Sequence, residues 1–438
     1  MIRRELAIAF RARVTWLVFA FAAVLVGHGF VLAVDLYSAA SRSALENVLM
    51  RRELDPLAGI VRPTFGGAQL AAAMLVPIVA TRLLAVEKER NTFGALALAL
   101  GSPAKVLLWK LAVACVVALF ILVPPIALFG VFAVLGGHLD LLEVAIGLGG
   151  HLLHLVLVAV ISVAAAAWTR TVAQATTLAI VVSLASWALE AGEGFAALAW
   201  LGPLEAAAVS RQLAPFEHAL VSIGALAWFA AALIGALALA LLGARFDLRG
   251  RTRARGAILI ALAGAAAIVA STRIHRAYDW TELRRASLPP AVVAELRALE
   301  HPIEITVWLD REDSRRRQLE RDTLTKLLLA RPDIRVVMPL DGPSGRAPAV
   351  HDDAYGRLVI RVGDESRETR STSRREIVTL IFETAGRPLP GWAQPAYPGY
   401  PVVIDGWRAT LLHAVAYGVV PGAVFVIGFI LTRRRRIS

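Results

Sequence analysis

The sequence predicts a mainly α-helical, polytopic membrane protein of about eight transmembrane helices, with an inserted extracytoplasmic α/β domain. Hydrophobic residues make up 57% of the 438-residue chain and the mean hydropathy is +0.63. Charged residues are only 18%, which is too few for an ordinary soluble protein of this size. Apolar runs long enough to cross a bilayer recur along the chain. One interval, residues 272–408, is charged and breaks this pattern.

The apolar runs predict where the chain crosses the membrane. The expected spans are residues 14–36, 67–84, 107–135, 143–168, 172–189, 218–242, 257–270 and 411–431. Pro124 and Pro125 predict a kink or break within the third span, because proline lacks a backbone donor. Residues 190–216 are apolar but punctuated by Gly and Pro, which favours a re-entrant or interfacial hairpin. Residues 41–54 fit a short amphipathic helix.

Basic residues predict the orientation of these spans. The net charge is +12 and the pI is about 10.7, but Arg and Lys gather at the ends of apolar runs rather than in a stripe interleaved with aromatics. This pattern indicates cytoplasmic loops and argues against a nucleic acid partner. The expected cytoplasmic anchors are Arg3, Arg4, Arg251, Arg253 and Arg255. Both termini, including the basic tail after the last span, are then cytoplasmic, in a multi-pass protein of the cell inner (plasma) membrane.

The charged interval predicts a separate domain outside the cytoplasm. Its expected strands are residues 301–310, 333–340 and 355–362, with a turn at 363–364. Its expected helices are residues 314–330 and 374–385, the first with Leu319, Leu324, Leu327 and Leu328 on one face. This alternation predicts a small sheet with packed helices. Residues 387–403 are rich in Pro, Gly and aromatics and suit a semi-rigid linker that returns the chain to the membrane.

Residues 87–110 form a charged interruption between the second and third spans. Glu87, Glu89, Arg90 and Lys105 surround an apolar helix, so this segment offers charge pairing and a hydrophobic docking face to another protein. The alternative is that these charges only mark the boundary of the membrane.

The same stretch resembles the loop between spans two and three of ABC-2 type exporter permeases. In that family an E-x-E-x-x-T stretch leads to a leucine-rich helix, then a turn of a small residue and Pro, then a Lys that opens the third span. The matching residues here are Glu87, Glu89, Arg90, Thr92, Pro103, Lys105 and Lys110. Asn91 departs from the pattern, because the family usually has Gly there, and it is expected to stiffen the turn. The resemblance covers residues 1–255 as a six-helix permease domain.

Residues 279–309 carry a second resemblance, to the auxiliary membrane protein encoded beside gliding-motility-associated ABC transporter permeases. There a D-x-T-x-x-x-x-x-S-L-P segment follows a transmembrane helix, and Asp279, Thr281, Ser287, Leu288 and Pro289 match it. The chain therefore resembles a permease fused to a shortened auxiliary protein. The expected parts are the permease domain, a seventh helix at 256–271, the extracytoplasmic domain at 272–408, and the eighth helix with its tail at 409–438.

The resemblance implies the permease subunit of an ATP-driven ABC transporter, most simply an exporter, and not an enzyme. No G-x-x-x-x-G-K-[ST] phosphate loop occurs in the chain. ATP and Mg are therefore expected on a separate ATPase subunit, with no cofactor or metal on this chain. A second permease half, either an identical or a related chain, is also expected. The alternative is a non-transporting membrane sensor or assembly protein whose outer domain binds an envelope partner.

Three further groups of residues could carry chemistry. His151 and His154 share one face of the fourth span and suit a metal site, a proton relay or simple helix packing. Acidic residues at 310, 312–313 and 352–353 could bind Ca²⁺ or act as acid and base, but neighbouring Arg residues favour solvated ion pairs. Cys115 is the sole cysteine, which excludes a disulfide within the chain and a zinc site built on cysteines.

Overall fold

The computed structural model describes residues 2–191, 208–245, 247–274, 276–310, 313–340, 354–392 and 397–433. The chain divides into two compact units. The first contains the described residues within 2–274 and 398–433, and the second contains those within 276–397. Each unit has its own hydrophobic core.

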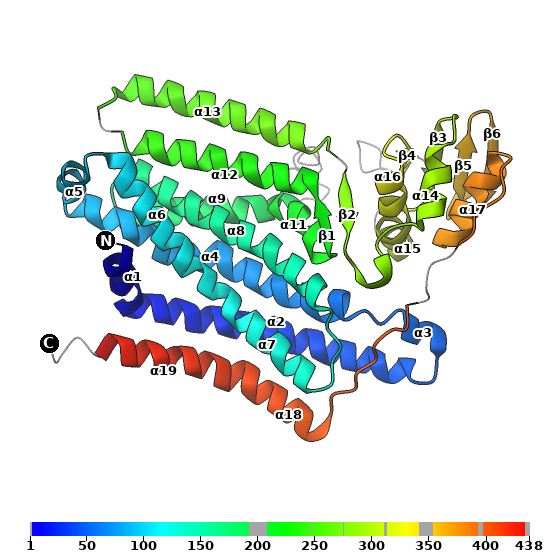
Figure 1. Cartoon of the computed structure of the whole chain (residues 1–438), viewed down its shortest axis with the longest axis horizontal. Helices are drawn as coiled ribbons and strands as arrows, with labels where there is room; N and C mark the ends of the chain where they lie inside the picture. The colour runs from blue at the N-terminus through cyan, green and yellow to red at the C-terminus, as the bar shows by residue number, and fades with distance from the viewer. Residues whose placement is uncertain are drawn as a thin grey trace. The chain divides into compact units, whose positions relative to one another are not determined.

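The first unit is built from helices (Figure 1). Those of its first half are α1 (Ile2–Arg11), α2 (Arg13–Ala44), α3 (Val48–Arg52), the π-helical turn η1 (Leu57–Val61), α4 (Arg62–Glu89), α5 (Phe93–Leu100), α6 (Pro103–Leu119), the 3₁₀ turn η2 (Phe120–Leu122) and α7 (Val123–Val134). The remainder are α8 (Leu141–Trp168), α9 (Val172–Ala191), α11 (Val209–Glu217), the short strand β1 (Leu220–Ser222), α12 (Ile223–Gly243), α13 (Gly250–Ser271), α18 (Gly406–Ala414), the π-helical turn η8 (Val415–Val419) and α19 (Val420–Arg433).

Seven helical stretches of the described chain are long and apolar enough to cross a membrane, and they confirm a polytopic membrane architecture. They are Arg13–Ala44, Leu57–Glu89, Pro103–Val134, Leu141–Trp168, Ile223–Gly243, Gly250–Ser271 and Gly406–Arg433. The expected span at 172–189 lies within α9 (Val172–Ala191), whose apolar stretch Val172–Ala185 is shorter than these seven. The seventh span is longer than the predicted 257–270, because α13 begins at Gly250 and takes the Arg-rich segment into its first turns. Arg is a good helix former, so the helix continues past the apolar run.

The third span is interrupted where proline predicts it. Helix α6 ends at Leu119, the 3₁₀ turn η2 follows, and α7 begins at Val123, directly before Pro124 and Pro125. A proline in the first turn of a helix loses no hydrogen bond, so the chain resumes a regular helix there.

Two of the predicted elements lie between the membrane spans. The amphipathic helix predicted at 41–54 is wrong as a single element, because α2 continues to Ala44 and only Val48–Arg52 forms a separate helix. The hairpin predicted at 190–216 lies largely outside the described residues. The structure shows its last part, which belongs to α11.

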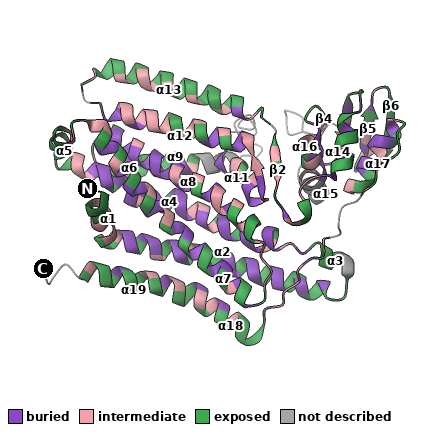
Figure 2. Ribbon diagram, in the orientation of Figure 1, coloured by how far each residue is buried: buried purple, intermediate pink, exposed green. Residues whose placement is uncertain are grey.

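The long helices pack side by side in the order α13, α12, α8, α4, α2 and α19, while α6 and α9 each pack against both α4 and α8 (Figure 1). The middle of this row is buried and its two ends, α13 and α19, are mostly exposed (Figure 2). Small residues allow the close packing. A side chain at Gly67 would meet the backbone of Leu25 at 3.2 Å, and one at Gly27 would meet the carbonyl of Ala416 at 2.7 Å. Such contacts are typical of helices packed within a bilayer.

The residues that precede the last span are bound to α2. The backbone N–H groups of Val402 and Ile404 donate to the hydroxyls of Ser41 (3.0 Å) and Ser38 (2.9 Å). The Tyr37 hydroxyl donates to the carbonyl of Tyr400 at 2.8 Å. The end of the predicted linker is therefore a fixed part of the first unit.

The second unit is a four-stranded sheet with helices. Its elements are β2 (Ala277–Asp279), the 3₁₀ turn η5 (Glu282–Arg284), α14 (Pro290–Arg297), β3 (Ile303–Val307), α15 (Ser314–Leu319), the π-helical turn η6 (Glu320–Leu324), α16 (Thr325–Ala330), β4 (Arg335–Val337), β5 (Leu358–Val362), β6 (Glu365–Thr369) and α17 (Arg374–Thr384). The sheet order is β4-β3-β5-β6, with β3 parallel to β4 and antiparallel to β5.

The strands predicted at 301–310, 333–340 and 355–362 correspond to β3, β4 and β5, and the helices predicted at 314–330 and 374–385 correspond to α15–α16 and α17, whereas β2, α14 and β6 are not predicted from the sequence. The inward residues Ile303, Ile305 and Val307 of β3 alternate as predicted. Strand β6 has the sequence ESRET, in which every residue is polar, so no apolar period signals it. It forms because Gly363, at φ 62°, turns the chain back along β5.

Candidate functional site

The segment after α4 begins with a left-handed turn at Asn91. Its φ of 55° places it in a region that Gly and Asn tolerate better than other residues. The N–H of Thr92 donates to the Glu87 carbonyl (2.9 Å), and the N–H of Asn91 donates to the Lys88 carbonyl (3.1 Å). These two bonds form a Schellman motif, which ends a helix cleanly. Asn91 therefore supplies the left-handed residue that ends α4.

Helix α5 follows and presents two apolar faces. Phe93 is buried in the core, and Leu96, Ala97 and Leu100 pack against the same core at helical spacing. The opposite face, formed by Gly94, Ala95, Leu98 and Ala99, is exposed, and Leu98 is 86% exposed. A surface helix normally has a polar outer face. The outer face of α5 is instead apolar and exposed, and we call it the α5 face.

The junction of α5 and α6 is a second tight turn. Gly101 ends α5 at φ 74°, and Ser102 caps α6 by accepting a hydrogen bond from the N–H of Ala104 at 3.2 Å. Pro103 takes the first helical position, where its missing N–H costs nothing. Both ends of α5 are thus fixed by local backbone chemistry.

Lys110 joins three helices near this turn. Its ammonium lies 2.8 Å from a Glu5 oxygen on α1 and 3.2 Å from a Glu87 oxygen on α4, and its side chain is only 6% exposed. The Thr92 hydroxyl donates to the other Glu87 oxygen. The cation thus offsets two neighbouring carboxylates that would otherwise repel each other.

Lys88 and Glu89 hold the turn between α8 and α9. The Lys88 ammonium donates to the carbonyls of Ala166 and Ala167, each at 2.8 Å, and to that of Thr169. These carbonyls lie at the end of α8, where a cation is favoured. Glu89 accepts a hydrogen bond of 2.6 Å from the N–H of Val172, the first residue of α9. A carboxylate is favoured at that helix start.

The structure divides the predicted coupling residues into two groups. Glu87, Glu89, Thr92 and Lys110 make contacts within the protein, whereas Arg90 and Lys105 are exposed on either side of α5. No pattern in the sequence assigns a role to Glu5 or to Lys88. The single signal for Lys88 is its place between two predicted glutamates.

The predicted anchors lie at the same end of the first unit as α5 (Figure 1). Arg3, Arg4, Arg251 and Arg255 are exposed. Arg253 instead donates to the Gly243 carbonyl at 2.8 Å and lies over the Trp168 ring, 4.9 Å from its centroid. It caps α12 and contributes a cation–π contact to α8.

Two residues of the second resemblance, Asp279 and Thr281, form hydrogen bonds within one turn. An Asp279 oxygen accepts hydrogen bonds from the Thr281 N–H (2.9 Å) and hydroxyl (2.6 Å), and the Thr281 hydroxyl accepts one from the N–H of Ala286 (3.2 Å). Leu288 is buried in the core of the second unit, and Pro289 precedes α14. The matched Asp and Thr therefore shape the entry to α14.

The other candidate residues have defined surroundings. His151 is buried, stacks on Phe65 with ring centroids 4.4 Å apart, and lies 3.2 Å from a Glu217 oxygen. The neighbouring His154 is also buried. No group of three or more potential ligands that could hold a metal ion occurs within the described residues.

Asp313 lies in an ion pair. It accepts hydrogen bonds from Arg315 (2.8 Å) and from the Tyr355 hydroxyl (2.9 Å). The hydrogen bond from Arg315 holds the pKa of Asp313 well below its usual value. Residues 312 and 352–353 of the predicted acidic clusters lie outside the described residues.

The fold and these contacts define the class of the protein as a mainly α-helical, multi-pass membrane protein. Comparisons with protein-family models, with curated proteins and with solved structures found no match to this chain.

Proposed function

We propose that this chain is the permease subunit of an ATP-driven ABC transporter and that the α5 face receives the ATPase subunit. The observation that carries the proposal is the exposed apolar face of α5, held at both ends by capped turns and flanked by the exposed charges of Arg90 and Lys105. Its sequence pattern resembles the coupling loop of ABC-2 type permeases.

The contacts behind α5 supply a route for force. Glu87, Lys88 and Glu89 are consecutive. Glu87 contacts Lys110 of α6, which also pairs with Glu5 of α1. Lys88 contacts the end of α8, and Glu89 contacts the start of α9. A displacement of α5 by ATP-driven closure of the ATPase would thus reach four helices through one short segment. Charge-assisted hydrogen bonds suit this task because they are directional and stronger than neutral ones.

The proposed topology places α5 in the cytoplasm. The basic residues of α1, of the 169–171 turn, of the start of α13 and of the end of α19 share the end of the first unit that bears α5 (Figure 1). The positive-inside rule assigns that end to the cytoplasm of a cell membrane. The chain leaves the first unit after Ile274 and re-enters it at Pro398, at the end opposite α5, so the second unit is proposed to be an extracytoplasmic auxiliary domain. A second permease half completes the transporter.

The test is reconstitution with the ABC ATPase encoded in an adjacent reading frame. The purified complex in nanodiscs should hydrolyse ATP, and Leu98→Glu should abolish both the complex and its contribution to hydrolysis. Leu45→Glu is a matched control. Leu45 is also an exposed leucine, at 62%, but it follows the C-terminal end of α2, away from α5.

Two outcomes would contradict the proposal. One is a wild-type chain that binds no such ATPase, which would favour the alternative of a membrane sensor or assembly protein. The other is a Leu98→Glu chain that forms the complex and hydrolyses ATP as the wild type does, which would remove the α5 face from the coupling site.

A further inference from the structure

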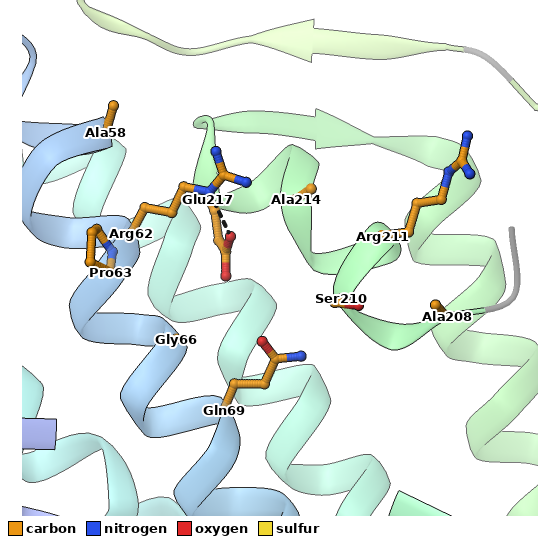
Figure 3. Close-up of a pocket in the computed structure, with 10 residues that line it drawn as sticks. All are labelled: Ala58, Arg62, Pro63, Gly66, Gln69, Ala208, Ser210, Arg211, Ala214 and Glu217. Carbon is orange, nitrogen blue, oxygen red and sulfur yellow. Dashed lines mark ion pairs between the residues drawn. The ribbon is translucent and has the colours of Figure 1, made fainter. Parts of the chain in front are cut away.

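A cavity of about 550 Å³ lies between the start of α4 and α11, in the first unit (Figure 3). This volume suits a small-molecule ligand. Its polar lining comes from Arg62 and Gln69 on α4 and from Ser210, Arg211 and Glu217 on α11. Helix α4 has 28 residues, so Arg62 is roughly 40 Å from Glu89 along its axis. The cavity and the α5 face therefore lie at opposite ends of the same helix.

A buried carboxylate fixes one side of the Arg62 guanidinium. One Glu217 oxygen lies 3.3 Å from Nε of Arg62, and the other lies 3.2 Å from Nε2 of His151. Glu217 is only 8% exposed and His151 only 1%. Because both oxygens of Glu217 are engaged, the guanidinium is held in one orientation at the cavity wall (Figure 3).

Three hydrogen-bonding groups around the cavity lack a partner among the described residues. The two terminal nitrogens of Arg62 form no hydrogen bond with the described part of the chain, since its ion pair uses Nε. The Ser210 hydroxyl is buried and has no hydrogen-bond partner within the same residues. The Gln69 amide points toward the space between the two helices (Figure 3). Of the three, the Ser210 hydroxyl is buried, and a buried polar group without a partner is costly, so its place beside the partly exposed Arg62 indicates a ligand.

The charge of the lining selects an anion. Arg62 and Arg211 carry two positive charges against one negative charge on Glu217. The terminal nitrogens of a guanidinium form a fork that matches two oxygens of a phosphate. A serine hydroxyl and an amide N–H can donate to the same oxyanion.

We propose that this cavity binds a phosphate group, with Arg62 as its principal ligand and Ser210 and Gln69 as further donors. The phosphate belongs either to the headgroup of an anionic lipid or to a small soluble molecule. The inference requires binding alone, so it stands whether or not the chain is a transporter subunit.

The experiment has two arms on the purified full-length chain. In the first, native mass spectrometry counts the phosphatidylglycerol retained by protein from nanodiscs of phosphatidylcholine with phosphatidylglycerol. In the second, the thermal stabilisation by inorganic phosphate is measured in detergent. Retention in the first arm alone assigns a lipid headgroup, and stabilisation in the second assigns a soluble phosphate; either result supports the proposal.

Three variants and a control make the result specific. Arg62→Gln should weaken binding about tenfold or more, because a charge-assisted bond is lost. Ser210→Ala should weaken it about threefold without cost to the fold, because that hydroxyl has no partner to lose among the described residues. Glu217→Gln should strengthen binding, because it removes the competing negative charge while the amide oxygen can still accept from Nε of Arg62 and keep the guanidinium oriented. Arg52→Gln, an exposed arginine that does not line the cavity, should bind as the wild type does.

The proposal fails if the wild type binds neither probe, or if Arg62→Gln and Ser210→Ala both bind as tightly as the wild type. A Glu217→Gln chain that binds more weakly, as Arg62→Gln does, would also overturn it, since the pair would then serve only to hold the helices together.

Discussion

The ammonium of Lys110 lies 2.8 Å from the carboxylate of Glu5, which ties α6 to a helix 105 residues earlier in the chain. The same ammonium contacts Glu87 at the end of α4. A single side chain therefore connects the N-terminal helix, the second span and the third span beside α5.

Replacement of Lys110 by methionine tests this connection. The change keeps an unbranched side chain of nearly the same length but leaves Glu5 and Glu87 close together without a cation. Loss of one partner of a buried ion pair is strongly destabilising, and the partial exposure of both carboxylates lowers the expected cost here to about 2–3 kcal/mol. Thermal unfolding of the purified protein in detergent would measure it. Lys105→Met, at an exposed position on the same helix, should be neutral.

Lys88 and Glu89 allow a separate prediction about the α8–α9 turn. Lys88→Met removes the donor to three carbonyls at the end of α8 and should destabilise the protein by about 2 kcal/mol. Glu89→Gln keeps an acceptor for the Val172 N–H and should cost less than about 1 kcal/mol. Hydrogen exchange of residues 165–175 reports the turn directly. Equal protection in Lys88→Met and in the wild type would show that the turn does not depend on this contact.

The sequence predicts the membrane helices well because their signals are local. A run of apolar residues reveals a span, and the Pro124-Pro125 pair reveals the break between α6 and α7. The role of a charged residue is harder to predict from the sequence. Glu87 and Glu89 would look the same in the sequence whether they contacted a partner protein or other helices of this chain. The structure shows them bound to Lys110 and to the start of α9, while the exposed outer face of α5 has an apolar pattern that a lipid-facing helix shares.

Contacts between distant segments account for what the sequence misses. Glu217 meets Arg62 and His151 only because α11 packs against α8 and against η1, the turn that precedes α4, and no spacing in the chain brings these three residues together. Strand β6 is similar, since its polar residues pair with β5 through the hairpin at Gly363 rather than through an apolar pattern of their own. The register of a strand and the partner of a charged residue therefore depend on the tertiary fold and cannot be predicted from a local sequence pattern.

Asn91 gives a prediction about the turn before α5. Asn91→Gly should keep the Schellman motif and change the free energy of unfolding by less than about 0.5 kcal/mol, because Gly readily adopts φ 55°. Asn91→Val should cost about 1–2 kcal/mol or more, because a β-branched residue is strained there. Thermal unfolding of the two variants checks the order. A valine variant as stable as the wild type would contradict the left-handed turn.

Arg331 gives a prediction for the second unit. Its side chain is largely buried, and it donates to the carbonyls of Leu296 and His301, each at 3.1 Å, and to Asp333. Arg331→Lys retains the charge but cannot reach these acceptors with the same planar fork, so it should cost about 1–3 kcal/mol. Hydrogen exchange of residues 303–307 in the full-length chain measures the loss. Arg335→Lys, at a position 77% exposed on β4, is the control and should leave that exchange unchanged.

The pairing of Asp333 with Arg331 should also be visible as a dependence on pH. The hydrogen bond from Arg331 lowers the pKa of Asp333 below its ordinary value, about 3.9 in an unfolded chain. A carboxylate with a lowered pKa contributes stability above the unfolded value, and this contribution is lost as the pH falls through the folded value. It should stay below about 1 kcal/mol because Asp333 is 62% exposed. The stability difference between the wild type and Asp333→Asn should therefore be constant from pH 6 to 8 and shrink below about pH 4. A stability difference that grows on acidification would show that the Asp333 carboxylate does not stabilise the second unit.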